Sequence, residues 1–544
     1  MTIATTIRSR GTSTYAKIVL GLLASTAMAP SAGAQGVDTT CNPGTPSFSY
    51  ARPGSIQVDL ANPFAFKVLL RNGGQMDQGH DANTGFTYSS TGGEGKKGES
   101  GGVTGRGHDG ERGGKGGDIR VINCGTIHTV DPNVDGMYMR SVGGNGGQGG
   151  AGGAFDQRTG DGGEGGDGGA VTIEAVDGTS ILTKGNGSNG IHAFSLGGNG
   201  GKGGSGVLWG GSGKGATGAN GGNISIVAAT GTSDWQIETQ GSLAHGILAR
   251  SEGGFAGAGG SGNVIASGGK GGTGGNSGSD IKVDSGARIR TSGNGSNAMT
   301  LESVGGQGGD GNGGTRLFVS LGASGGVGGN AGRIDVHNAG DLVTAGDDAK
   351  GIAAQTIGGG GGSGGDAFNI GALGGLAIGG SGGGGGDAGE IAIRNSANVT
   401  TSGHGSFGLF ANSVGGGGGD GGHATGVTIG AGEAVQVSIG GSGGSGGNGH
   451  SVSIRQELGS VGSAISTGVL GSRPVPVAGV DQFVGDMATA MLAQSVGGGG
   501  GSGGRAIAVA ASGTDAGPTV SVAVSWPPEG MDFADILSLT PHGY

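Results

Sequence analysis

Proline is missing from the long middle of this 544-residue chain: all twelve prolines lie at or before Pro132 or at or after Pro474. Proline cannot donate a backbone hydrogen bond, so the interior of a stack of hydrogen-bonded strands excludes it. A proline-rich linker would show the opposite distribution. The gap in proline usage therefore favours an extended, hydrogen-bonded β architecture for the central region.

Aromatic and charged residues are also scarce, at 4% and 13% of the chain. The formal net charge of −11 is spread thinly, which is typical of a solubilising surface. The sequence has no basic patch interleaved with aromatic residues, so we do not expect it to bind nucleic acid.

Only two cysteines occur, Cys41 and Cys124. Zinc sites need cysteine pairs two to four residues apart, whereas these two are separated by 83 positions. In an oxidising compartment an even number of cysteines favours a disulfide, which here would tie the N-terminal segment to the first repeat. Two free thiols are the alternative.

Glycine is abundant instead, at 148 of 544 residues, against about 7% in ordinary proteins. The glycines do not follow a strict Gly-X-Y triplet, which argues against collagen. Apolar spacing of the helical kind does not persist between them, so helices are not expected. Either backbone hydrogen bonds between coils order the glycine tracts, or the tracts are mobile loops. Short alternating apolar inserts at 317–319, 368–370 and 435–439 favour order.

A phrase of the form Ser-Val-Gly-Gly recurs along the chain, each time at the start of a glycine tract. Its copies begin at Ser141, Ser195, Ser251, Ser303, Thr356, Ser413 and Ser495, with steps of 54, 56, 52, 53, 57 and 82 residues. An alternating apolar triplet recurs at Ile119, Val171, Ile224, Ile281, Ile334, Ile391 and Val452. Alternation rich in β-branched residues predicts short strands, and a fixed period predicts a stacked repeat architecture.

The sequence therefore predicts an all-β fold, a right-handed parallel β-helix or related β-solenoid of seven to eight imperfect glycine-rich units. Two or three coils per unit, at about 4.8 Å per coil, would give a length of roughly 70–100 Å. The long step of 82 residues predicts a protruding loop around 473–476. The expected segments are a signal peptide at 1–34, an N-terminal capping head at 35–100, the repeats at 101–525 and a non-repetitive tail at 526–544.

The first 34 residues have the pattern of a secretory signal. Basic residues up to Lys17 precede an apolar stretch at 18–28, and Ala32-Gly33-Ala34 supplies a small-residue cleavage site. The apolar stretch is too short to span a bilayer permanently. We therefore expect export, with no transmembrane span in the mature chain.

Motifs that would carry chemistry are weak. One match to a calcium-binding nonapeptide occurs at 361–368, but such sites need consecutive nine-residue coils, which the sequence lacks. Glycine-lysine pairs are never followed by Ser or Thr, so no phosphate-binding loop is expected. The histidines at 128, 192, 245, 337, 404 and 450 fall at different repeat positions and are expected to be isolated surface residues. No catalytic, cofactor-binding or metal-binding residue is predicted.

A hydrolase acting on polysaccharide is the alternative function, because some β-helices have that activity. It would require a pair of carboxylates flanking a groove. Asp280, Asp335 and Glu390 are interpreted as equivalent positions in different units instead of a local pair. The sequence therefore favours a protein without enzymatic activity.

The phrase at 491–504, Met-Leu-Ala-Gln-Ser-Val followed by a glycine tract, resembles the passenger region of glycine-rich autotransporters. The resemblance covers roughly 101–524 and implies an exported β-helical protein of a Gram-negative bacterium, with an adhesive or structural role. In that family a C-terminal outer-membrane barrel follows the passenger. Only 48 residues follow Val496, too few for such a barrel.

These features lead to expectations about location and partners. The chain should reach the cell surface, the outer membrane or the medium if a separate outer-membrane translocator exports it, and otherwise remain periplasmic. A surface glycan or protein is the expected kind of ligand, held by many weak and equivalent contacts. The last coil is expected to self-associate through its open strand edges.

Overall fold

The computed structural model describes residues 85–525, together with the backbone of three strands at 56–58, 68–72 and 76–77. Within 85–525 it leaves out 124–125, 154–157, 176–178, 207–209, 229–235, 263–265, 373, 431–432, 458–462, 469–487 and 513–518. The predicted signal peptide, the disulfide candidates Cys41 and Cys124, the predicted loop at 473–476 and the tail at 526–544 all lie outside the described residues.

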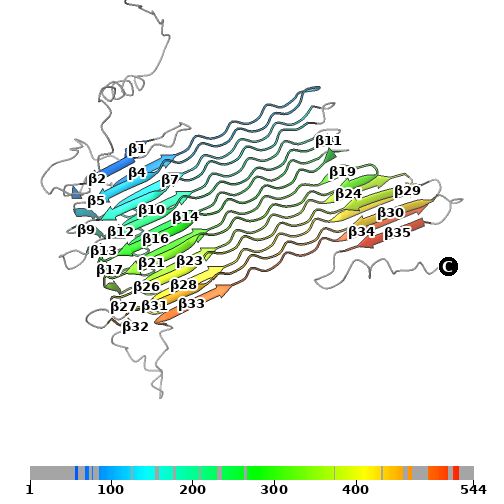
Figure 1. Ribbon diagram of the computed structural model, residues 1–544. Helices are drawn as coiled ribbons and strands as arrows, with labels where there is room; N and C mark the ends of the chain where they lie inside the picture. Colours follow the sequence, from blue (N-terminus) through cyan, green and yellow to red (C-terminus); the bar gives the residue numbers. More distant parts are fainter. Residues whose placement is uncertain are drawn as a thin grey trace, which may run out of the picture. The chain divides into compact units, whose positions relative to one another are not determined.

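Every strand pair in the described residues is parallel, and three long sheets run through successive coils (Figure 1). Sheet A contains β1 (Ile56–Val58), β4 (Phe86–Thr91), β7 (Met137–Val142), β10 (Ile191–Leu196), β14 (Ile247–Glu252), β18 (Met299–Val304), β23 (Ile352–Ile357), β28 (Leu409–Val414) and β33 (Met491–Val496). Sheet B contains β2 (Val68–Asn72), β5 (Ile119–Asn123), β8 (Val171–Ala175), β12 (Ile224–Ala228), β16 (Asp280–Ser285), β21 (Arg333–Asn338), β26 (Ile391–Asn395) and β31 (Val452–Gln456). Sheet C contains β3 (Met76–Asp77), β6 (Thr126–Thr129), β9 (Ser180–Thr183), β13 (Ile237–Thr239), β17 (Ile289–Thr291), β22 (Leu342–Thr344), β27 (Val399–Thr401) and β32 (Ile465–Thr467). The predicted all-β parallel solenoid is confirmed.

Each repeat makes a single coil, because each strand pairs with its counterpart one repeat further along the chain. Ile191 of β10 lies opposite Met137 of β7 on one side and Ile247 of β14 on the other. The prediction of two or three coils per unit was therefore wrong, and so was the length of 70–100 Å. Nine strands of sheet A at a spacing of about 4.8 Å span about 38 Å.

Sheets A, B and C surround one apolar interior, called here the three-sheet core. Side chains alternate along the strands, so every second residue points inward. The inward positions hold large aliphatic side chains, and Ile191, Ile247 and Met299 are each 0% exposed. The recurring apolar triplets thus form the continuous interior predicted by their spacing.

The glycine tracts fill the rest of each coil and are ordered. One tract leaves sheet A and a second returns to sheet B, so successive coils stack into an outgoing and a returning layer, drawn as wavy traces in Figure 1. Gly146 donates its N–H to Asn199 O in the next outgoing tract at 2.8 Å. Gly147 donates to Glu111 O in the returning layer, also at 2.8 Å. A three-residue period without internal hydrogen bonds is the geometry of the polyproline II helix.

Close backbone contact, both between neighbouring coils of one layer and between the two layers, explains why glycine fills nearly two of every three positions; a Cβ added at Gly253 would lie 1.9 Å from Gly275 O in the returning layer. A Cβ added at Gly254 would lie 2.0 Å from Gly198 O, a separation that no side chain can adopt. A Cβ at Gly360, which occupies an outward position, would find its nearest neighbour 3.8 Å away. Side chains larger than a methyl group are therefore confined to the outward residue of each three, and the inward positions hold glycine or an occasional buried alanine, as at Ala216 and Ala219.

The serine of the recurring Ser-Val-Gly-Gly phrase joins sheet A to the returning layer. Ser195 Oγ donates to Gly169 O at 2.8 Å and accepts the N–H of Gly222 at 2.8 Å. Ser141 makes the same pair of bonds one coil earlier, to Gly117 O and from the N–H of Gly169. The phrase recurs because each coil needs a buried hydroxyl to bridge two neighbouring backbones at this junction.

The far end of the layers carries shorter sheets (Figure 1). Sheet F contains β19 (Gly314–Arg316), β24 (Ala367–Gly371), β29 (Ala424–Gly430) and β34 (Ala506–Ser512), sheet G contains β20 (Val319–Leu321), β25 (Gly374–Ile378), β30 (Ala434–Ile439) and β35 (Thr519–Val524), and a two-stranded sheet contains β11 (Gly210–Gly211) and β15 (Ala266–Ser267). Sheets F and G have buried polar side chains, with Thr428 Oγ1 donating to Gln436 Oε1 at 2.7 Å. Their large apolar residues are exposed instead, including Ile370 at 47% and Ile429 at 66%.

The repeat extends further toward the N-terminus than the sequence predicted. The boundary of the expected head was residue 100, but β4 at Phe86–Thr91 already pairs in register with β7, and β1, β2 and β3 add one more strand to each long sheet. The described residues contain no helix that is long and apolar enough to cross a membrane.

Candidate binding groove

A groove of about 700 Å³ follows the edge of the returning layer next to sheet B, across several coils. One wall is a column of outward residues of the returning tracts, at Asn220, Asn276, Asn330 and Asp387. The opposite wall lies where the tracts enter sheet B, at Asn223, Ser279, Arg333 and Glu390. Small residues line it between the walls, at Gly221, Ser277, Ala331, Gly332, Ala388 and Gly389.

The first wall is a ladder of side-chain to backbone hydrogen bonds. Asn220 Oδ1 accepts the N–H of Asn276 at 2.9 Å, and Asn276 Oδ1 accepts the N–H of Asn330 at 2.7 Å. Asn330 Oδ1 accepts the N–H of Asp387 at 2.8 Å in the same way. The outward residue of a tract has a backbone N–H that no neighbouring tract can reach. An asparagine or aspartate one coil earlier satisfies this donor.

Each ladder asparagine uses its side-chain carbonyl oxygen to accept the backbone N–H of the next coil, and its amide nitrogen takes no part in the ladder. The described residues offer no hydrogen-bond partner to the Nδ2 atoms of Asn276 and Asn330, whose residues are exposed. These amides are therefore donors open to the groove, with their orientation fixed by the bond that the oxygen makes.

Arg333 of the second wall lies among acidic side chains. Its guanidinium lies 3.5 Å from Asp335 and 3.9 Å from Glu390. Burial raises the pKa of Asp280, a shift that the nearby Asp335 carboxylate increases and Arg333 opposes. The expectation that these three acids occupy equivalent positions in different units holds for Asp280 and Glu390 and was wrong for Asp335. Asp280 and Glu390 share a column with Arg333, whereas Asp335 pairs with Lys282 and Ala392.

The calcium-like match at 361–368 has a structural use in the outgoing layer. Asp366 Oδ1 accepts the backbone N–H of His423 at 2.7 Å, one coil further on. Asp310 Oδ1 accepts the N–H of Ser363 at 2.8 Å in a neighbouring column. Aspartates in the glycine tracts thus serve the same ladder role as the groove asparagines.

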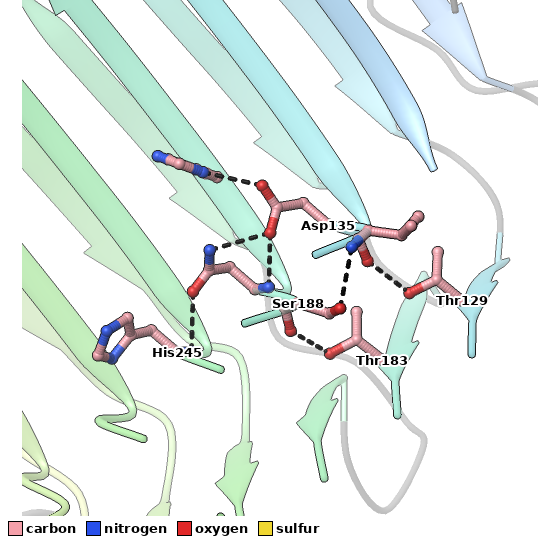
Figure 2. A network of polar contacts seen from close by, with 8 residues as sticks. Thr129, Asp135, Thr183, Ser188 and His245 are labelled. Atoms are coloured by element: carbon pink, nitrogen blue, oxygen red, sulfur yellow. Dashed lines mark hydrogen bonds and ion pairs between the residues drawn. The ribbon is translucent and has the colours of Figure 1, made fainter. Parts of the chain in front are cut away.

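A second polar network lies at the corner between sheets C and A (Figure 2). Asp135 Oδ2 lies 2.8 Å from His192 Nδ1, and Asp135 Oδ1 accepts the backbone N–H of Asn189 at 2.6 Å. Asn189 Oδ1 accepts the N–H of His245 at 2.9 Å, and His245 Nδ1 accepts the N–H of Asn297 at 3.1 Å. The prediction of isolated surface histidines was wrong for His192 and His245, which belong to one ladder.

Burial, together with the smaller effects of His192 and Lys350, lowers the pKa of His245 to about 4, and Asp135 opposes this shift. A neutral imidazole suits the acceptor role of its Nδ1 atom.

A buried serine in the same corner, Ser188, forms hydrogen bonds with backbone groups. Ser188 Oγ accepts the N–H of Val134 at 3.0 Å and donates to Asp131 O at 2.8 Å. The carbonyl of Ser188 accepts a bond from Thr183 Oγ1 at 2.6 Å (Figure 2). Because its hydroxyl is fully engaged in backbone bonds, this serine holds the turn and does not form a nucleophile with His192.

Sequence reasoning missed the groove, although its signal was present. Asn220, Asn276 and Asn330 stand at the same place in successive glycine tracts, three or four residues before the tract enters its sheet B strand. A search for side chains repeated every three residues within the tracts would have found this column.

Comparisons with known proteins found no matching family model, no matching curated protein and no matching solved structure. The structure therefore establishes a parallel β-solenoid with glycine layers, and no family is assigned.

Proposed function

We propose that this chain is an exported, non-enzymatic repeat protein of the autotransporter-passenger type, with an adhesive or structural role. The observation that carries the proposal is the pair of glycine layers, whose outward side chains form columns repeated from coil to coil. Such a surface offers many similar weak contacts whose combined strength replaces a single deep site.

Exposed apolar residues at the far end of the layers add to this proposal. Leu317 and Phe318 are 52% and 57% exposed, and several aliphatic residues of sheets F and G are similarly open. Apolar patches of this kind often mark interaction surfaces. Adhesion is tested by the binding of purified 35–544 to immobilised cell-surface extracts. The expected result is saturable binding, and no retention above that of albumin would refute an adhesive role.

The proposal places the chain outside the inner membrane of a Gram-negative cell. The signal-like segment at 1–34 supports export, and an outer-membrane translocator is the partner that we propose for transfer to the surface. Protease treatment of intact cells tests the location. Cleavage without lysis indicates surface display, whereas protection until the outer membrane is permeabilised indicates the periplasm.

Self-association through the last coil is part of the proposal. In the described residues, sheets A, F and G end at β33, β34 and β35, each with a single paired neighbour. Met491 of β33 is 44% exposed, whereas its counterpart Leu409 one coil earlier is fully buried. Sedimentation should show oligomers that grow with concentration and that Met491→Lys weakens. A monomer at every concentration would contradict this part.

A polysaccharide hydrolase is the second candidate, favoured by the carboxylates near Arg333 at the groove. Glu390 and Asp387 both line the groove, and paired carboxylates are the machinery of glycoside hydrolysis. Incubating purified 35–544 with polysaccharides tests this function. Turnover abolished by Glu390→Gln would replace the non-enzymatic proposal, and the absence of products would leave it standing.

A further inference from the structure

We infer that the groove between the returning glycine layer and sheet B binds an extended neutral glycan that lies across the coils. The inference rests on the proposed adhesive function and names the ligand class and the residues that recognise it. Asn276 and Asn330 supply donors from one wall, and Glu390 supplies acceptors from the other.

The shape of the groove suits a linear polymer. Its floor consists of glycine, alanine and one buried serine, so no large side chain interrupts it. From Asn220 to Asp387 the first wall crosses four coils, or about 14 Å at the spacing of parallel strands. A chain of sugar rings running along this direction would meet one ladder side chain at each coil.

The amide donors are fixed before any ligand arrives. The Oδ1 atoms of Asn276 and Asn330 accept backbone N–H groups at 2.7 and 2.8 Å, which holds the side-chain torsions. Surface asparagines without such a bond would lose rotamer freedom on binding, and that loss weakens affinity. Fixed Nδ2 donors avoid this cost, so even a shallow groove can select a ligand.

The polar character of the walls defines the ligand class. Amide N–H donors, a serine hydroxyl and carboxylate acceptors match the hydroxyl groups of sugars, which both accept and donate hydrogen bonds. Aspartate and glutamate outnumber the single arginine among the lining residues, which disfavours acidic polymers. His450 is the single aromatic side chain of the lining, and no aliphatic side chain in it is larger than alanine, which disfavours apolar ligands.

The chain itself provides a substitution that removes the donors and keeps the ladder. Aspartate already occupies this column at Asp167 and Asp387, where its Oδ1 accepts the N–H of the next coil at 3.2 and 2.7 Å. The double variant Asn276→Asp with Asn330→Asp should therefore retain its Tm while replacing two amide donors by carboxylates. If the double variant fails to fold, Asn330→Asp alone serves the same purpose.

A matched control lies on the opposite layer. Asn145 Oδ1 and Asn199 Oδ1 accept the N–H groups of Asn199 and Phe255, both at 2.8 Å, in an equivalent ladder outside the groove. Asn145→Asp with Asn199→Asp adds the same charge without touching the groove. The expected result is unchanged glycan binding.

The experiment is calorimetric titration of purified 35–544 with hexasaccharides of β-1,4-linked glucose and of β-1,4-linked mannose, and with a hexamer of galacturonate. We expect at least one neutral hexasaccharide to bind with a Kd tighter than about 1 mM, and the groove variant to weaken it by about tenfold or more. The galacturonate hexamer should bind more weakly than the neutral ligand.

Three results would overturn the inference: no measurable binding of either neutral hexasaccharide, equal binding by the groove variant, or preferred binding of galacturonate. The first or second of these, found together with undiminished retention of the wild-type chain on cell-surface extracts, would refute the groove and leave the adhesive function intact. Loss of surface retention by the wild-type chain itself would refute that function separately.

Discussion

The two parts of each coil have dry interiors made in different ways. In the three-sheet core, sheets A, B and C enclose aliphatic side chains such as Ile191 and Ile247, both 0% exposed. In the glycine layers, backbone packs directly on backbone, and Gly144 donates its N–H to Gly114 O across the interface at 2.8 Å. The core depends on the hydrophobic effect, whereas the layers depend on hydrogen bonds that only glycine allows the chains to form.

This difference shows that part of a chain can be ordered without the burial of large apolar side chains. Ordering a residue costs about 1–2 kcal/mol in backbone entropy alone, and the few buried side chains of the glycine layers are small, such as Ala219 and Ser277, so they offset little of it. Hydrogen bonds in two directions, within a layer and between layers, must supply the compensation. The core and the layers should therefore fail under different perturbations.

A single methyl group added inside the glycine layers should cause the largest loss of stability among these tests. Gly254→Ala would place a Cβ 2.0 Å from Gly198 O, and the other nearest atoms are also backbone of the preceding coil. We expect a loss of more than about 4 kcal/mol in the free energy of unfolding, or failure to fold. Gly360→Ala, at an outward position with its nearest atom at 3.8 Å, should change stability by less than about 0.5 kcal/mol. Denaturant titration compares the two, and equal effects would disprove the close packing.

Truncation of one buried aliphatic residue tests the core on the same scale. Ile247→Ala removes a fully buried side chain from β14 and should cost about 2–5 kcal/mol, depending on how far the cavity collapses. Hydrogen exchange should show that the loosened amides belong to sheets A, B and C, while the glycine layers keep their protection. Equal loosening of both parts would mean that they unfold as one unit.

Acid should destabilise the three-sheet core more than the glycine layers, because the ladder at the corner between sheets C and A contains the titratable group His245. Burial lowers the pKa of His245 to about 4 from an ordinary value near 6.5. The unfolded chain therefore binds more protons between these values, and stability falls as the pH drops from about 6.5 to about 4. The loss at the lower limit is on the order of 3 kcal/mol.

Replacement of His245 by asparagine provides the control for this pH dependence. Asparagine already stands at the equivalent positions Asn189 and Asn297, where each Oδ1 atom accepts the N–H of the next coil. The variant should keep the ladder and lose the His245 component of the slope of stability against pH between 4 and 6.5. An unchanged slope, measured by thermal melts across that range, would assign the acid sensitivity to another group.

The junction between core and layers should show the smallest of these effects. Ser195→Ala removes a buried hydroxyl and leaves the carbonyl of Gly169 and the N–H of Gly222 without their partner. Unsatisfied buried groups of this kind cost about 1–3 kcal/mol. A loss within that range, seen by denaturant titration, would support the bridging role of the Ser-Val-Gly-Gly phrase, and a neutral outcome would contradict it.

The strands and their pairing could be predicted from the sequence because both are periodic. The triplets beginning at Ile224 and Ile281 are aligned residue for residue in sheet B, as their equal place in the repeat indicated. The number of coils per repeat could not be obtained in this way. The period gives only the number of residues per repeat. The hydropathy pattern does not show that one glycine tract runs away from the three sheets and the next returns to them.

The groove and the corner network needed three-dimensional register. Asn276 and Asn330 lie 54 residues apart in the sequence and are joined by one hydrogen bond. His192 and His245 stand at different places in their repeats, yet Asn189 and Asp135 connect them. The Asn276–Asn330 bond joins equivalent positions of successive tracts, whose recurrence the sequence records, whereas the contact between His192 and Asp135 joins unlike positions of neighbouring coils and leaves no periodic signal.

The outward third of each glycine tract has a consequence for how such a chain changes over generations. At Gly143, Gly146 and Gly149, an added methyl group would collide with backbone within 2.1 Å, so selection should disfavour replacements there, with alanine as the exception seen at Ala256 in the column of Gly146. Asn145 and Gln148 face solvent between them, and substitutions at these sites leave the packing untouched. Sequence drift should therefore concentrate on one residue in three, so that the side chains on both outer faces can change over generations while the backbone layers beneath keep their structure.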